Sequence, residues 1–239
     1  GCRPMDDIDL LAAPDHLPLL RAALLDLGFR HPDRHVDLAE RDGLMLDLHD
    51  DVVNSGRVTL RRFGGWMAAA SIWEDRCQIE AEGVRLPSMS HRDMALYTSL
   101  HALRHGYSRL TWFVDLALLL RGEEEVEWEP LLERAREFRL ERPLQYCLHS
   151  LSRLPEFAPA EPVREWIESF QLTRLEELVL SRALRDRGAG EWGDLLWSFN
   201  VSGIWRRSLF LLQTAFPGPE VLLQVFPFLP RPLAVLAYR

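Results

Sequence analysis

Two aspartates separated by one apolar residue stand near the start of the chain, at Asp7 and Asp9. The run from Ile8 to Leu11 predicts a short buried strand, although aspartate is depleted in strands because its side chain competes for backbone hydrogen bonds. A spacing of two places both carboxylates on one face of the strand, and Ile8 is expected to point the other way, into the core. Two carboxylates on one face can bind a divalent cation.

A second segment, residues 44–49, repeats this design. Alternation predicts that Asp47 and His49 share one face of a strand while Leu46 and Leu48 line the other. Three carboxylates could then converge on Mg²⁺ or Mn²⁺, and a pair of such ions can activate an attacking oxygen and stabilise a leaving one. The alternative is a solvated sheet edge. The repetition of the design on a second strand favours the functional interpretation.

The elements expected around these acids form an α+β front region. Asp15 is the expected N-cap of a helix whose leucines recur at helical spacing, and Gly28 is its expected stop. Asp42 and Gly43 predict a hairpin between two strands. The expected strands cover residues 8–11, 35–39, 44–49, 57–61 and 78–86, with a helical piece at residues 66–73.

Beyond Pro87 the pattern is helical throughout. Ser90 is the expected N-cap of a helix that ends near Gly106, and Thr173 with Glu176 predicts a capping box. Apolar stripes predict further helices over residues 109–121, from Trp128 to Phe138, and after Pro143 and Pro162. The expected organisation is therefore an α+β domain over residues 1–88 and an α-helical domain over residues 89–239.

Composition limits the classes of partner. A net charge of −8 and a pI near 5.5 argue against a broad basic surface for duplex DNA or anionic lipid. The three widely spaced cysteines form neither a disulfide framework nor a metal knuckle, which fits a reducing cytoplasm. No signal segment or membrane span is expected, because prolines interrupt the apolar stretch at residues 221–238.

The segment at residues 3–11, R-P-M-D-D-I-D-L-L, resembles the R-P-M-x-D-I-D-L-L signature of the uncharacterised nucleotidyltransferase family of bacteria, part of the polymerase-β-type superfamily. Residues 46–49, L-D-L-H, are similar to a further element of that family. So are the histidine pair His101 and His105 and the R-L-T-W-F-V-D segment at residues 109–115. The resemblance implies a nucleotidyltransferase-like mixed sheet with helices, followed by an α-helical domain.

The resemblance also implies a function: metal-dependent transfer of a nucleoside monophosphate from an NTP, expected to be ATP, to an acceptor hydroxyl. Asp7, Asp9 and Asp47 would be the catalytic acids and the ligands of Mg²⁺ or Mn²⁺, and Asp47 would also be the base for the hydroxyl. Arg3 and His49 would contact the nucleotide. The acceptor stays open among a small molecule, a protein side chain and a nucleic-acid end.

One departure from the superfamily pattern leaves alternatives open. Its enzymes carry a glycine-serine turn before the double acid, whereas Gly64 and Gly65 follow it here. Because the chain opens at Gly1 without methionine, we expect either a fragment of a longer enzyme or a catalytically inactive relative that binds or regulates. A phosphohydrolase that uses the same acids is the third alternative.

His101 and His105 have the four-residue spacing of metal ligands on a helix, but zinc is not expected there. Ala102 occupies the position of glutamate in H-E-x-x-H, and no third ligand follows. We expect both histidines to be packed or hydrogen-bonded, for example to Asp115.

Overall fold

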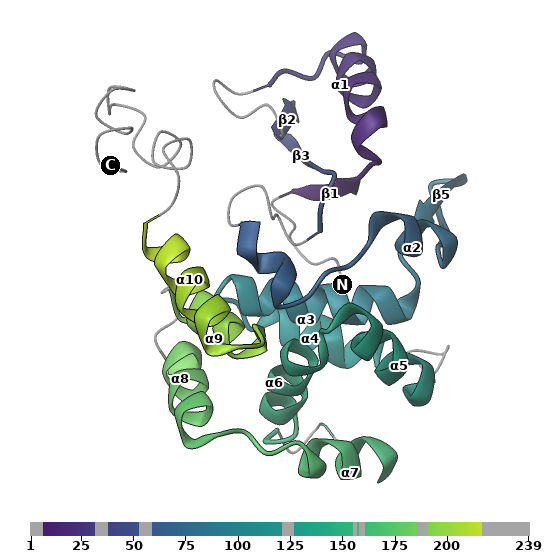
Figure 1. The fold of residues 1–239 in the computed structure, drawn as a ribbon. Helices are drawn as coiled ribbons and strands as arrows, with labels where there is room; N and C mark the ends of the chain where they lie inside the picture. Colours follow the sequence, from purple (N-terminus) through teal and green to yellow (C-terminus); the bar gives the residue numbers. More distant parts are fainter. Residues whose placement is uncertain are drawn as a thin grey trace.

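The structure is a computed structural model that describes residues 7–31, 38–52, 59–120, 127–154, 157, 161–185 and 191–216. It is a mixed α+β fold, as predicted, with small sheets in the first ninety residues and helices after them (Figure 1). The three-stranded sheet and α1 stand together at one side of the larger helical part.

The three-stranded sheet has the order β1-β3-β2, formed by β1 (Ile8–Leu11), β3 (Leu44–His49) and β2 (Leu38–Arg41). β1 pairs in parallel with β3, whereas β2 and β3 form an antiparallel hairpin. Asp42 and Gly43 both have positive φ, 53° and 82°, which is the turn geometry that the Asp-Gly pair predicts. The central strand therefore carries the second acid segment between two partners.

Burial alternates along β3 as the sequence predicts. Leu46 and Leu48 are buried, and they pack with residues of α1 (Leu17–Asp26) and the strand β2 in a small cluster. The opposite face of β3 is therefore left to Asp47 and His49. The prediction for Ile8 was wrong, because this side chain is 38% exposed at the start of the edge strand.

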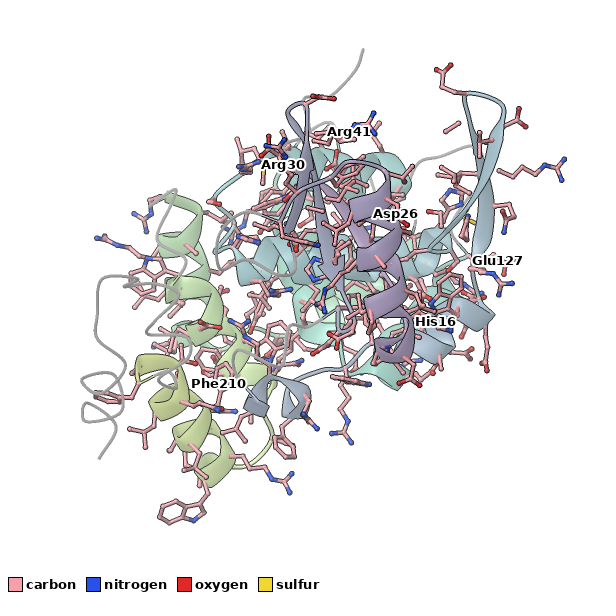
Figure 2. The ribbon with its side chains drawn as sticks, turned by 90° about the horizontal axis from the view of Figure 1, so that it is seen from above. His16, Asp26, Arg30, Arg41, Glu127 and Phe210 are labelled. Atoms are coloured by element: carbon pink, nitrogen blue, oxygen red, sulfur yellow. The ribbon has the colours of Figure 1, made fainter. Side chains whose placement is uncertain are left out.

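Helix α1 begins differently from the prediction. Asp15 is not the N-cap, because Pro14–His16 form the 3-10 turn η1 and Leu17 is the first residue of α1. Proline at position 14 favours such a tight first turn. Gly28 ends the helix as expected, with φ 85°. Figure 2 shows α1 from above, between the labelled residues His16 and Asp26, with Arg30 and with Arg41 of β2 to one side of it.

Two further segments follow β3 in the chain and precede the first long helix. Residues 59–61 were predicted as strand, but the 3-10 helix η2 (Thr59–Phe63) occupies this position. Its geometry follows from distant partners, since Gln213 Oε1 accepts a hydrogen bond from the Leu60 amide and Asp194 pairs with Arg61. The region of residues 78–86 is a separate hairpin of β4 (Cys77–Ala81) and β5 (Val84–Ser88), which follows α2 (Ala69–Glu74).

The predicted caps of the helical part are present. Ser90 Oγ accepts a hydrogen bond from the Asp93 amide, and Thr173 and Glu176 form the reciprocal capping box. The helices are α3 (His91–Arg104), α4 (Thr111–Leu119), α5 (Trp128–Phe138), α6 (Glu141–Leu151), α7 (Glu161–Ser169), α8 (Arg174–Arg185), α9 (Glu191–Asn200) and α10 (Ile204–Ala215).

Helix α3 is the centre of the helical part, because it contacts α4, α5, α6 and α9. Leu96, Leu100 and Leu103 are completely buried in the large hydrophobic cluster. That cluster begins at Val52, whereas the small cluster ends at Leu48. The domain boundary near residue 88 stays a prediction. In the part of the chain that the structure describes, no helix has the length and apolar character needed to cross a membrane.

Candidate metal centre

The pairing of β1 with β3 brings the two acid segments together. In their parallel register Asp9 is the direct partner of Asp47, and Leu11 is the partner of His49. Because alternate residues of a strand share a face, Asp47 and His49 project on the same side. One ligand atom each from Asp9, Asp47 and His49 lies within 4.8 Å of the others.

The imidazole of His49 lies between the two carboxylates. Its Nε2 is 3.0 Å from Asp9 Oδ1 and 3.1 Å from Asp47 Oδ2. Since carboxylate oxygens accept, Nε2 must be the donor to both. Adjacent ligands of an octahedral ion at about 2.1 Å are about 3.0 Å apart. The two carboxylates are oxygen ligands of the kind that a divalent cation such as Mg²⁺ or Mn²⁺ prefers, and His49 could join them only after Nε2 loses its proton.

Contacts within the cluster shift the pKa values of His49 and Asp9. Burial lowers the pKa of His49, but its hydrogen bonds to Asp47 and Asp9 outweigh burial and raise the pKa to about 9. Burial raises the pKa of Asp9, whereas hydrogen bonds from His49 and Tyr97 lower it more, so the net pKa of Asp9 is lowered. Without a metal ion, the cluster therefore consists of a protonated His49 between the carboxylates of Asp9 and Asp47.

Tyr97 is a member of this site that the sequence analysis missed. Its Oη donates a hydrogen bond of 2.8 Å to Asp9 Oδ2, across 88 positions of the chain. Burial and the charge of Asp9 raise the pKa of Tyr97 well above its usual range, so the phenol keeps its proton. The available signal was spacing, because Tyr97 lies four residues before His101 and shares its helix face.

His101 and His105 form an aromatic group with their neighbours, in line with the expected packed role. The His101 ring centroid is 5.5 Å from that of Tyr97, 4.5 Å from His105 and 5.1 Å from Trp112. Burial and the charge of His105 lower the pKa of His101 to about 4, so its ring is neutral at pH 7. Its Nδ1 is buried without a hydrogen-bond partner.

The two remaining predicted site residues, Asp7 and Arg3, are not among the converging ligands of the described part of the chain. Asp7 is exposed, precedes β1 and is not in the group of converging ligands, although its side chain does have an interaction partner. Its role as a metal ligand stays a prediction. Arg3 lies outside the described residues.

Comparison with known families agrees with this geometry. The family described as "Uncharacterised nucleotidyltransferase" matches residues 1–156, which include both acid strands and α3. The chain belongs to this nucleotidyltransferase family. Membership supports nucleotidyl transfer as the general activity, with a nucleotide as substrate. No curated protein and no solved structure matches the chain.

The family match gives the cluster a chemical context. Nucleotidyltransferases use divalent cations with NTP substrates, and Asp9, Asp47 and His49 of this member form a group with suitable donors. The match extends through Tyr97, so it includes the residue of α3 that donates a hydrogen bond to Asp9.

Proposed function

We propose that this chain transfers a nucleoside monophosphate from ATP to an acceptor hydroxyl, with Mg²⁺ or Mn²⁺ held by Asp9 and Asp47. The observation that carries the proposal is the registered pair Asp9–Asp47, joined by His49 within 4.8 Å, in a nucleotidyltransferase family member. Asp7 would complete the set of acids, and His49 and Arg3 would contact the nucleotide.

The proposed reaction is a displacement at the α-phosphorus. The acceptor hydroxyl oxygen forms a bond to that phosphorus while the bond to the bridging oxygen breaks, and pyrophosphate leaves with its electron pair. Asp47 accepts the hydroxyl proton. A bound divalent cation would offset negative charge on the phosphates and orient the attacking and leaving oxygens. Both carboxylate oxygens of Asp9 accept hydrogen bonds, one from His49 and one from Tyr97, and these bonds keep the side chain in position.

The acceptor is a small molecule or a protein side chain in this proposal. Net acidity disfavours duplex DNA as a partner. Free thiols at Cys77 and Cys147 fit a reducing compartment such as the cytoplasm.

Pyrophosphate release tests the proposal whatever the acceptor is. The chain is incubated with [α-³²P]ATP and Mn²⁺, together with a small-molecule extract, and both pyrophosphate and transferred label are measured. Asp9→Asn and Asp47→Asn should each lower the rate by at least about 10³-fold, because each removes a charged ligand. Asp42→Asn is the matched control, since this carboxylate lies at the exposed hairpin tip and its φ of 53° suits asparagine.

The products separate the competing functions. Label on an acceptor together with pyrophosphate supports the transferase. Orthophosphate without label transfer indicates a phosphohydrolase. A chain that binds Mn²⁺-ATP and releases neither product is a binding or regulatory relative, and this result would contradict the proposed activity.

A further inference from the structure

One hydrogen bond connects the acid-bearing sheet to the centre of the helical part. Asp9 belongs to β1, in which Leu10 packs against the small cluster and Leu11 against the large one, whereas Tyr97 belongs to α3, which is buried in the large cluster. The bond from Tyr97 Oη to Asp9 Oδ2 is 2.8 Å long. A donor on the helical part, Tyr97, therefore restrains an acidic side chain of the sheet, Asp9.

The two donors to Asp9 use different oxygens of its carboxylate. His49 Nε2 donates to Oδ1 and Tyr97 Oη donates to Oδ2. The carboxylate torsion χ2 of an aspartate is broad when nothing restrains it. With Oδ2 held by Tyr97, rotation about χ2 is restricted, and Oδ1 stays on the side of His49 and Asp47.

The tyrosine ring itself is well placed to act as a fixed support. Its centroid is 5.5 Å from that of His101, which packs in turn against His105 and Trp112. The neighbouring residues Leu96 and Leu100 are completely buried, so α3 has little freedom to shift. A donor with these restraints can orient an acid more strictly than water or a surface side chain.

We propose that Tyr97 is a positioning residue, which orients Asp9 so that its Oδ1 and the carboxylate of Asp47 bind one divalent cation together. This proposal rests on the function proposed above. Tyr97 acts through Asp9 and does not itself bind the cation. Its hydroxyl thus makes the affinity of the site depend on the contact between sheet and helical part.

Metal affinity measured without ATP tests this role. Mn²⁺ is titrated into the full chain by calorimetry or by electron paramagnetic resonance, with unsubstituted protein and Tyr97→Phe. Loss of a group that orients a metal ligand weakens affinity by about 10–100-fold, and we expect the Kd for Mn²⁺ to rise within that range. At saturating Mn²⁺ the transfer rate should recover most of its value, because the ligands themselves are intact.

Tyr146→Phe is the matched control. Tyr146 Oη also donates to a carboxylate, Glu176 Oε1, at 2.7 Å, but within the helical core on α6 and α8. Both substitutions remove one hydroxyl and one tyrosine–carboxylate bond, so their effects on thermal unfolding can be compared directly. Only Tyr97→Phe should change the Kd for Mn²⁺.

The outcomes distinguish this proposal from the proposed function. If the unsubstituted chain binds Mn²⁺ and Asp9→Asn abolishes binding, while Tyr97→Phe keeps the full affinity, the positioning role is wrong and the metal site stands. An equal loss of affinity in Tyr146→Phe would also overturn it, because the effect would then be one of general stability. If the unsubstituted chain does not bind Mn²⁺, both proposals fail.

Discussion

The sheet that carries the acids and the helical part differ in how they are held together. The small cluster consists of Ala12, Leu17, Leu24, Phe29, Ala39, Leu46 and Leu48, most of them slightly accessible. The large cluster surrounds α3, and many of its leucines are completely buried. Because buried apolar area is the main source of stability, the acids lie on the less stable of the two regions.

This difference suggests how the site keeps its geometry. Backbone pairing fixes Asp9 against Asp47, and Tyr97 adds a restraint that comes from the better-packed region. A site of this kind can have a rigid part and a part that opens more easily.

The largest effect is expected from the same truncation made in each region. Leu144 on α6 is completely buried, and Leu144→Ala should lower the free energy of unfolding by about 2–5 kcal/mol. Leu48→Ala removes an equivalent side chain beneath the acids, where Leu48 is 3% exposed. It should increase hydrogen exchange of the β3 amides while the helical circular dichroism signal keeps its unfolding midpoint. An equal shift of that midpoint by both variants would show that the regions unfold as one unit.

A smaller effect is expected at the contact between α9 and α3. A Cβ at Gly193 would overlap the carbonyl oxygen of Leu103, so the two helices must separate to accept it. Alanine normally stabilises a helix relative to glycine, but Gly193→Ala should destabilise this protein by about 1–3 kcal/mol. Urea unfolding followed by circular dichroism measures the change. Increased stability would mean that the two helices are less closely packed than described.

The smallest perturbation is chemical labelling of thiols. Cys147 is buried in the large cluster, and burial raises its pKa to about 12. Since the thiolate is the reactive form, Cys147 should resist iodoacetamide until the helical part unfolds. Cys77 in β4 is half-buried and should react earlier as urea is added. Mass spectrometry of labelled peptides gives both rates, and early modification of Cys147 would contradict the difference in packing.

Local patterns in the sequence predicted much of the fold and pointed to three of the four side chains in the cluster, Asp9, Asp47 and His49. Alternation along β3 correctly placed Asp47 opposite Leu46 and Leu48, and the Asp-Gly turn and the Ser90 cap are local signals of the same kind. The convergence of Asp9 with Asp47 followed from two strands with one design.

The errors concern features that depend on distant contacts. Residues 59–61 have β character, yet they form a 3-10 helix whose Leu60 amide and Arg61 guanidinium donate hydrogen bonds to Gln213 of α10 and Asp194 of α9. Ile8 is exposed because it is the first residue of β1, which is an edge strand of the sheet. Tyr97 was missed because its contact with Asp9 requires α3 to dock beside β1, and the spacing from His101 indicates only the helix face on which Tyr97 lies.

The parallel register of β1 and β3 has a consequence for variation within the family. Residues 12–43 separate the two strands, and changes in length between α1 and β2 leave the pairing of Asp9 with Asp47 intact if the strands and α1 keep their own sequence. One residue inserted within either strand would instead turn its acid to the apolar face. Sequence length should therefore vary among relatives between α1 and β2, while the strands themselves admit substitutions but no insertions.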